Sequence, residues 1–150
     1  MKLRHVTDAS EAMALAPALD RYAEEAMNEF RDTPLPPEVG RGFVERVFDD
    51  PHAVLVVAED EGGLAGLLAT APFQDPLTGE IVPMIVLLHV EAAHRHRGLA
   101  RSLVAEARRL LVPRGHTALA ARAGHNDDAL ISMGERWGYL RHWELMLREG

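Results

Sequence analysis

The most constraining feature of the sequence is an apolar strand followed by a short glycine-containing loop and an amphipathic helix. The run Ile81–Val90 (IVPMIVLLHV) is apolar almost throughout, as is typical of a central strand covered on both faces. After Gly98, the apolar residues Leu99, Leu103 and Ala107 recur at helical spacing, which predicts a helix with one face turned toward a core. A chain built around this unit should fold as helices packed on a sheet.

The remaining patterns predict the elements on either side of this unit. A helix should begin at the N-cap Asp8 and be kinked or split by Pro17, and a second short helix should end near Phe48. Apolar runs bounded by turn residues predict strands at residues 3–6, 52–60, 64–73 and 117–123, one strand or a strand pair at 138–149, and a further helix at 126–137. The resulting order is β-α-α-β-β-β-α-β-α-β, which predicts an α/β or α+β fold with one mixed sheet and helices on both faces.

Composition narrows the classes of function. A chain of 150 residues is most often one domain, so we expect a single domain over residues 1–150. The absence of Cys excludes disulfides, thiolate metal sites and Cys nucleophiles. No apolar run approaches the roughly 20 residues that span a bilayer, and the first residues lack the apolar core of a signal peptide. We therefore expect a cytoplasmic protein without a membrane partner.

The charge distribution argues against nucleic acid as a partner. The net charge is −7, and residues 1–61 contain 14 Asp and Glu against 6 Lys and Arg. This half of the chain would repel a phosphate backbone. A solvated acidic surface is the simpler interpretation, and attraction of a cationic substrate by the electrostatic field is the functional one. Four of these acidic residues lie close together in the sequence near one predicted helix: Glu24, Glu25, Glu29 and Asp32.

The loop HRHRGLA, from His94 to Ala100, has four interpretations. A metal site is disfavoured, because Arg95 and Arg97 would add positive charge beside a cation and no carboxylate completes the ligand set. A nucleic-acid patch is disfavoured, because the basic cluster is short and lacks aromatic neighbours. A solvated loop, in which Gly98 permits a tight turn, stays open.

The fourth interpretation is a phosphate cradle. Because the strand ends near Val90 and the helix begins near Gly98, the backbone N–H groups of the first helical turn should be free, and the helix dipole is positive there. Gly98 and Ala100 are small, so a phosphate oxygen can approach the backbone closely. Neither G-K-[ST] nor G-x-G-x-x-G is present, so the loop is neither a Walker loop nor a dinucleotide-binding fingerprint.

Two motifs make the chain similar to one known family. The strand end Leu88-His89-Val90 followed by R-x-x-G-x-A at Arg95–Ala100 resembles the loop motif of the GNAT N-acetyltransferases. Downstream, HNDDALISMGERWGY resembles their second motif, N-x-x-A followed by G-[FY]. The order of elements also resembles the family's over essentially the whole chain. The resemblance implies a single GNAT domain over residues 1–150, with a central mixed, mostly antiparallel sheet flanked by helices.

For the cofactor, the resemblance implies acetyl-CoA as co-substrate and no metal. The pantetheine arm would pair like an added strand with Leu88, His89 and Val90. The pyrophosphate would rest on backbone amides of the loop and the first helical turn, at Arg95, His96, Arg97, Gly98, Leu99, Ala100 and Arg101. Asn126 matches the family's Asn near the pantetheine arm, and the N-cap of the following helix is its structural alternative.

The sequence departs from the family pattern at the catalytic positions. The usual Tyr that protonates the leaving thiolate falls at Met133 or Gly134, neither of which can donate a proton. Met84 and Val86 are apolar where family members often carry Glu or His. Strand alternation predicts that His89 points to the opposite face from these two residues.

The candidate catalytic residues are therefore His89, Glu29 and Glu80, and Glu91 is no better placed than the other carboxylates. A base that acts through ordered water is the favoured interpretation. The sequence predicts an N-acetyltransferase that transfers the acetyl group to a primary amine of a small molecule or peptide by direct attack. The alternative is a catalytically weak acetyl-CoA-binding regulatory or partner module on the same fold, which the missing Tyr motivates.

The short tail after Gly138 predicts an acceptor site that is open or completed by a second subunit, so a homodimer is expected while the oligomeric state stays open. The identity of the amine and the preferred acyl chain also stay open, because no motif points to the residues that set either pocket.

Overall fold

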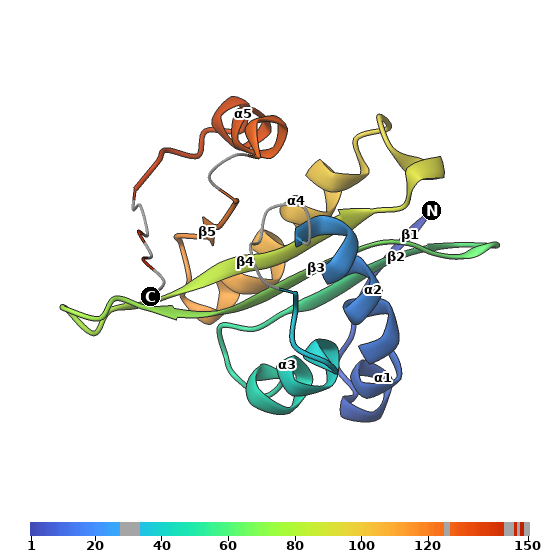
Figure 1. Cartoon of the computed structure of the whole chain (residues 1–150), viewed down its shortest axis with the longest axis horizontal. Helices are drawn as coiled ribbons and strands as arrows, with labels where there is room; N and C mark the ends of the chain where they lie inside the picture. The colour runs from blue at the N-terminus through green and yellow to red at the C-terminus, as the bar shows by residue number, and fades with distance from the viewer. Residues whose placement is uncertain (28–33, 125–126, 143–145, 147, 149–150) are drawn as a thin grey trace.

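The computed structural model describes residues 1–27, 34–124, 127–142, 146 and 148. Within these residues the centre of the fold is a five-stranded sheet in which each strand is hydrogen-bonded to the next one along the chain (Figure 1). The strands are β1 (Lys2–His5), β2 (Leu55–Asp60), β3 (Gly63–Gln74), β4 (Ile81–Val90) and β5 (Ala120–Ala121). Strands β1 to β4 pair antiparallel and β5 pairs parallel with β4, so the predicted mixed, mostly antiparallel sheet is confirmed.

The two hairpins form where the turn residues predicted them. In the turn between β2 and β3, the Gly62 N–H donates to Asp60 Oδ1 at 2.8 Å. In the turn between β3 and β4, Asp75 Oδ1 accepts the N–H groups of Leu77 and Thr78 at 2.8 and 2.9 Å. Short polar side chains that accept nearby backbone N–H groups are the usual means of closing such turns.

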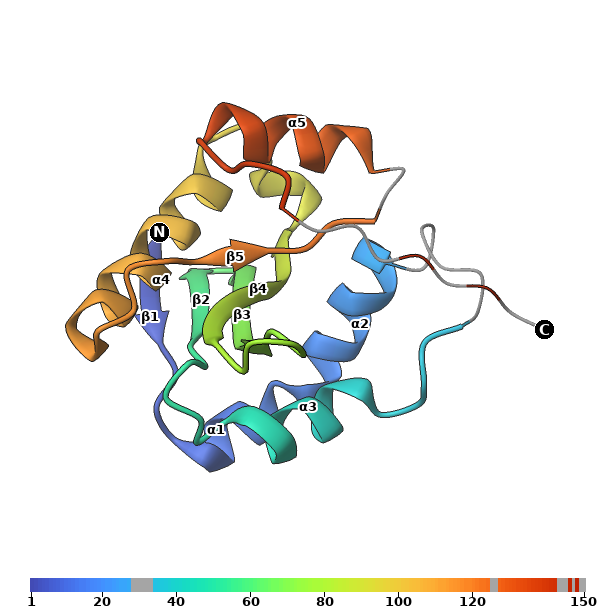
Figure 2. The ribbon, with the colours of Figure 1, turned by 90° about the vertical axis from the view of Figure 1, so that its left-hand side faces the viewer.

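Helices cover both faces of the sheet (Figures 1 and 2). One face carries α1 (Ala9–Ala14), α2 (Ala16–Met27) and α3 (Val39–Val47), and the other carries α4 (Leu99–Leu111). The predicted split at Pro17 is confirmed, because α1 ends at Ala14 and Pro17 lies in the first turn of α2, where a missing N–H is tolerated. None of the helices in the described part of the chain is both long and apolar enough to cross a membrane.

Each face of the sheet has its own apolar core. On the α4 side, Val56, Leu68 and Leu103 are fully buried. On the opposite side, Val57 and Leu67 are fully buried beneath α1, α2 and α3. Neighbouring residues of one strand thus pack into different cores, as the two-residue alternation of a strand requires.

The C-terminal part of the chain differs from the predicted order. The strand predicted at 117–123 is reduced to Ala120–Ala121. Helix α5 (Asp128–Arg136) begins near the predicted position, and its N-cap is Asp127, whose carboxylate accepts the Leu130 N–H at 3.2 Å. The structural alternative for Asn126, that it caps this helix, is therefore wrong.

The strand predicted at 138–149 is not present in the described residues 138–142, 146 and 148, and the other residues of that range lie outside the described part. Helix α5 ends directly before this segment. Gly138 has a left-handed φ of 88°, and the Tyr139 N–H donates to the Gly134 carbonyl at 2.9 Å. This left-handed C-cap satisfies the last carbonyl groups of the helix.

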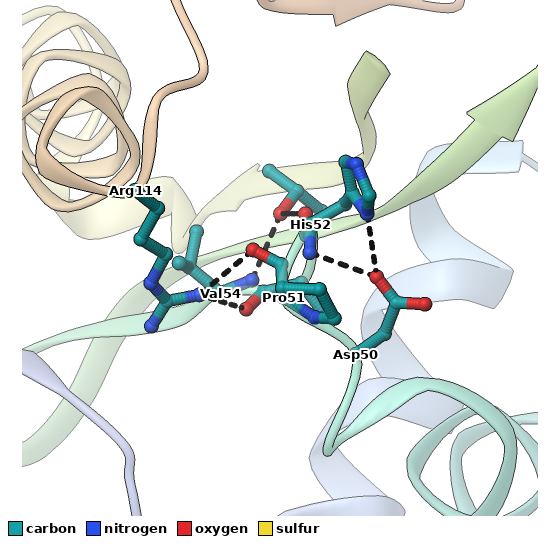
Figure 3. A network of polar contacts seen from close by, with 7 residues as sticks. Asp50, Pro51, His52, Val54 and Arg114 are labelled. Atoms are coloured by element: carbon teal, nitrogen blue, oxygen red, sulfur yellow. Dashed lines mark hydrogen bonds and ion pairs between the residues drawn. The ribbon is translucent and has the colours of Figure 1, made fainter. Parts of the chain in front are cut away.

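A polar network holds the loop between α3 and β2 (Figure 3). The backbone N–H of His52 donates to Asp50 Oδ1 at 2.8 Å, and His52 Nδ1 lies 2.9 Å from the same oxygen. The Thr70 hydroxyl donates to the His52 carbonyl and accepts the Val54 N–H, both at 2.9 Å. Burial raises the pKa of Asp50, but its hydrogen bonds with His52 outweigh burial and hold that pKa below its usual value.

Arg114 fastens the same loop from the other side. It lies in the short helix η3 (Val112–Arg114) that follows α4, and its guanidinium donates to the carbonyls of Pro51 and Ala53, each at 3.1 Å. These bonds satisfy carbonyl groups that have no partner in the sheet, and they join η3 to the start of β2.

Candidate functional site

The loop between β4 and α4 contains two left-handed residues. It runs through the short helix η2 (Ala92–His94), and then His96 has φ 63° and Gly98 has φ 76°. A Cβ on Gly98 would meet no atom within 4 Å, so the backbone conformation, rather than lack of space, favours glycine there. Left-handed residues other than glycine are uncommon, although His adopts this region more often than most side chains. Backbones with such residues form concave sites in which successive N–H groups can bind an anion.

The N-terminus of α4 is open to a ligand. Gly98 is the N-cap and has no side chain to accept an N–H of the first turn. The Ser102 N–H donates to the Gly98 carbonyl at 3.1 Å as the first bond of the helix. The N–H groups of Leu99, Ala100 and Arg101 therefore have no partner within the helix. Together with the positive end of the helix dipole, they favour a bound phosphate.

The basic side chains of the loop have different partners. Arg95 Nε donates to the Val90 carbonyl at 3.0 Å, so this guanidinium closes the loop onto the end of β4. His94 Nε2 lies 2.6 Å from Asp60 Oδ2, which ties η2 to the hairpin of β2 and β3. The side chain of Arg97 is exposed and can add positive charge beside an anion.

Strand β4 has a free edge near this loop. Strand β5 pairs only with Met84 and Ile85, and the next contact is the Arg122 N–H with the Ile85 carbonyl at 3.4 Å. Among the described residues, no strand pairs with residues 86–90 on the β5 side. An extended ligand can add to such an edge through backbone hydrogen bonds.

A β-bulge changes the direction in which the end of β4 faces. The register between β3 and β4 shifts by one residue and leaves Val86 as an extra residue in β4. Val86 and Leu87 therefore pack into the same core, beneath α2, and His89 faces Tyr22 of α2 on this side. The prediction that His89 points away from the face of Val86 is wrong, because alternation holds only along a regular strand.

His89 is a buried imidazole between aromatic and charged groups. Its side chain is 7% exposed, and its ring centroid lies 4.4 Å from that of Tyr22. Its Nε2 lies 2.9 Å from Glu25 Oε2, although the approach lacks hydrogen-bond geometry. Burial lowers the pKa of His89 below its ordinary value, and the charge of Glu25 offsets burial only in part. The imidazole is therefore neutral at neutral pH and can accept a proton.

Glu91 joins the end of β4 to α2. Its Oε1 accepts the Tyr22 hydroxyl at 2.7 Å and Arg21 Nη2 at 2.9 Å. The hydrogen bond from Tyr22 lowers the pKa of Glu91, and the charge of Arg21 lowers it further. Burial and the bond to Glu91 raise the pKa of Tyr22. At neutral pH the pair is therefore a neutral phenol that donates to a carboxylate.

The structure separates the predicted site residues. Glu80 precedes β4 at the opposite end of the strand from His89, about 30 Å away for an extended strand, so it does not join the His89 group. Leu88 and Val90 turn their side chains into the α4 core. Glu29 and Asn126 lie outside the described residues.

Sequence reasoning missed Arg21 and Tyr22 and found only a general role for Glu25. Tyr22 follows Leu19 by three residues in α2, so its position indicates a core residue and gives no signal for its hydroxyl group. It also lies 69 residues before Glu91. A single sequence holds no signal for a contact between segments so far apart, beyond the acidic cluster that includes Glu25.

Neither a cluster of metal-ligating side chains nor a proton donor at the family's Tyr position is found in the described residues. In the described ranges no group of three or more His, Cys, Asp or Glu side chains is arranged to hold a metal ion. Met133 and Gly134, which match the family's Tyr position, lie in α5 and have no donor group.

Sequence comparison relates the chain to acetyltransferases. The sequence model of the family described as "Acetyltransferase (GNAT) family" matches residues 18–139. N-acetyltransferase family 8 member 2 of Rattus norvegicus is 25% identical over 96 residues, which make up 64% of this chain and 42% of that protein. The chain thus spans less than half the length of this curated relative.

Solved structures share the fold. Ribosomal-protein-alanine N-acetyltransferase from Brucella melitensis biovar Abortus 2308 has a TM-score of 0.67 at 19% identity and covers 100% of both chains. The structure of AAC(6')-Iy with the bisubstrate analog CoA-S-monomethyl-acetylneamine has a TM-score of 0.74 at 14% identity, over 99% of this chain and 97% of that chain. Aminoglycoside antibiotic 6'-N-acetyltransferase AAC(6')-Ih from Acinetobacter baumannii has a TM-score of 0.73 at 12% identity, over 99% and 97%. At these identities the likeness concerns the fold, and it confirms the predicted fold class.

Proposed function

The chain belongs to the GNAT acetyltransferase family, and on this premise we propose that it transfers an acetyl group from acetyl-CoA to a primary amine. One observation carries the proposal. A buried imidazole with a lowered pKa, that of His89, lies on a strand whose free edge leads directly to an open helix N-terminus. A base, a binding edge for an extended arm and an anion site thus follow one another along one segment of the chain.

Acetyl-CoA is the proposed co-substrate. The N–H groups of the loop and of the first turn of α4, over residues 95–101, hold the pyrophosphate, and the exposed guanidiniums of Arg97 and Arg101 add charge. The backbone of Leu88, His89 and Val90 pairs with the pantetheine arm. Asn126 stays a predicted contact of that arm. A CoA-containing analog in AAC(6')-Iy, a protein of the same fold, supports this assignment.

His89 is the proposed general base. The neutral imidazole takes a proton from the ammonium form of the acceptor, and the neutral nitrogen then forms a bond to the thioester carbon and gives up one further proton to water. The C–S bond then breaks, and the sulfur leaves as a thiolate. Since Met133 and Gly134 carry no donor, water or the Ser132 hydroxyl returns a proton to that sulfur.

A cationic amine is the proposed acceptor. Asp20 and Glu24 of α2, with residues 34–39, line a cavity of about 280 Å³, and Glu25 of the same helix lies beside His89. Negative side chains around a site raise the local concentration of cations. Proteins with this fold include an aminoglycoside acetyltransferase and a ribosomal-protein-alanine acetyltransferase. The proposed acceptors therefore include amines of both small molecules and peptides.

CoA release measures the proposed activity. Acetyl-CoA is incubated with polyamines, aminoglycosides, amino acids and peptides with an N-terminal alanine, and free thiol is detected. We expect turnover with at least one amine, and loss of about 10²- to 10⁴-fold in kcat for His89→Gln, which removes the base. His116→Gln, on the loop beyond η3, is the control that keeps the activity. An unchanged kcat for His89→Gln would refute the assignment of the base.

Gly98→Glu tests the cofactor site separately. Acetyl-CoA at about 100 times its Kd should stabilise the wild-type protein by roughly 2.7 kcal/mol. The variant should show no thermal shift, because a carboxylate at the N-cap repels the pyrophosphate. Unchanged affinity of this variant for acetyl-CoA would contradict the phosphate cradle.

The alternative function is a catalytically weak acetyl-CoA-binding regulatory or partner module. The absence of a proton donor at Met133 and Gly134 favours it. Stabilisation by acetyl-CoA without CoA release for any amine of the panel would support this alternative.

A single domain over residues 1–150 and a homodimeric state are also proposed. Limited proteolysis tests the single domain, and analytical sedimentation tests the homodimer.

A further inference from the structure

Helix α2 and the end of β4 are joined by a buried hydrogen bond beside the imidazole of His89. The side chain of Tyr22 is fully buried, and its hydroxyl donates to Glu91 Oε1 at 2.7 Å. Arg21 donates to the same oxygen at 2.9 Å. Glu91 is itself anchored, because its backbone N–H donates to the Ala65 carbonyl of β3 at 2.8 Å. The carboxylate therefore holds Tyr22 at a defined position relative to the sheet.

The ring of Tyr22 in turn contacts the imidazole. The two ring centroids are 4.4 Å apart and the ring planes are tilted by 35°. Glu91 follows His89 by two residues in the sequence. Tyr22 therefore contacts the end of β4 twice, through its hydroxyl at Glu91 and through its ring at His89. Glu25 Oε2 lies 2.9 Å from His89 Nε2. The imidazole is thus limited in its rotation by an aromatic ring that is itself held by a hydrogen bond.

We propose that Tyr22 and Glu91 are positioning residues for the His89 base. This inference rests on the proposed function, since it assigns a role to the surroundings of the same imidazole. A residue that served packing alone could be Phe, because burying a hydroxyl costs free energy unless it is hydrogen-bonded. A bond from a phenol to a carboxylate is charge-assisted and directional, which suits it to fixing a ring in one place.

The charged groups that face His89 come from three segments. Arg21 and Glu25 lie on α2, Glu91 follows β4, and Arg95 lies in the loop before α4. Glu25 and Glu91 raise the pKa of His89, whereas Arg95 and Arg21 lower it, all against the larger effect of burial. Changes to Glu91 and to Arg21 should therefore move the titration of His89 in opposite directions.

Tyr22→Phe tests positioning by kinetics. The variant keeps the ring and removes only the hydroxyl, so we expect kcat to fall about tenfold while the KM for acetyl-CoA stays unchanged, because the base is misplaced and the cofactor site is intact. The assay uses the amine that gives the fastest CoA release. Tyr139→Phe is the matched control. It removes a hydroxyl that is also buried but has no hydrogen-bond partner among the described residues, and its kcat should stay at the wild-type value.

The titration of the His89 imidazole tests the same inference without an acceptor. NMR spectra of protein labelled at histidine are recorded against pH, and the signal of His89 is identified by its loss in His89→Gln. The midpoint should fall in Glu91→Gln, which removes a negative charge, and rise in Arg21→Gln, which removes a positive one. In Tyr22→Phe the line should broaden or split, because the ring samples more than one position.

The two measurements separate the possible failures. If His89→Gln keeps the wild-type kcat, the assignment of the base fails, and the positioning role fails with it whatever the titrations show. If His89→Gln is inactive but Tyr22→Phe keeps both the wild-type kcat and the wild-type line shape, the positioning role is overturned and the proposed function stands. Equal midpoints in Glu91→Gln, Arg21→Gln and the wild-type protein would also overturn it.

Discussion

At the scale of single residues, His96 indicates that the cradle loop depends on its backbone. Its φ of 63° lies in the left-handed region, and its side chain is exposed. This conformation costs most L-residues about 1–2 kcal/mol, and His, Asn and Asp adopt it more often than the others. The loop keeps the conformation at this position even though the imidazole of His96 makes no hydrogen bond among the described residues.

Replacing His96 by Asn or by Val separates backbone from side chain. Both variants remove the imidazole, but Asn adopts the left-handed region easily and Val does not. We expect His96→Asn to bind acetyl-CoA with a Kd within about twofold of wild type. His96→Val should bind about tenfold more weakly, since the strain must be overcome in the bound loop. Calorimetric titration gives both constants, and an equal loss in the two variants would assign the role to the imidazole instead.

At the scale of elements, α2 connects the fold to the site. The helix carries Tyr22 and Glu25, and α3 holds it in place through Gly40. The Gly40 N–H donates to Asp20 Oδ1 at 2.6 Å. A Cβ on Gly40 would lie 2.4 Å from the Ala16 carbonyl oxygen, so the close approach of the two helices requires a residue without a side chain.

Gly40→Ala and Gly42→Ala form a matched pair in α3. The first should lower the free energy of unfolding by about 1–3 kcal/mol, because the methyl group forces α3 away from α2. The second should raise it by about 0.5–1 kcal/mol, because alanine is the better helix former. At Gly42 the nearest atom to a Cβ is the guanidinium of Arg46, at 3.1 Å, which can move aside. Urea unfolding measures both values, and equal stability of the two variants would contradict the close packing at Gly40.

At the scale of the whole molecule, burial of two histidines couples stability to pH. Burial lowers the pKa of His89, and burial together with the charge of Arg114 lowers that of His5. A histidine whose folded pKa lies below the unfolded value binds more protons when unfolded. Hydrogen bonds that lower the pKa values of Asp60 and Glu91 act in the same direction at lower pH.

The free energy of unfolding should therefore fall as the solution is acidified. The first decrease should begin near the unfolded histidine pKa of about 6.5 and the second near the carboxyl values of about 4. The variant His5→Gln/His89→Gln should lose the first decrease and keep the second, whereas His96→Asn, at an exposed histidine, should keep both. Urea unfolding at a series of pH values tests this. A wild-type free energy of unfolding that stays constant between pH 7 and pH 5 would contradict it.

The sequence by itself determined the elements that depend on local spacing. The bounds of β4, the split of the first helix at Pro17, the turns near Asp60 and Asp75, and the glycine at the start of α4 all follow from residues within one short segment. Propensity, capping and hydrophobic periodicity act over such distances. The family motifs also lie within single segments, and so both the fold class and the family could be recognised from them.

Only the tertiary structure decided the surroundings of His89. The bulge at Val86 depends on how β4 pairs with β3, and it turned His89 toward α2 against the regular alternation. Tyr22 and Glu91 meet across 69 residues of chain. Hydrophobic periodicity indicates whether a residue is buried. It does not indicate which distant residue that side chain contacts, or where a β-bulge adds a residue to a strand. The chemistry of the site depends on these contacts, because they set the charge and the orientation of the imidazole.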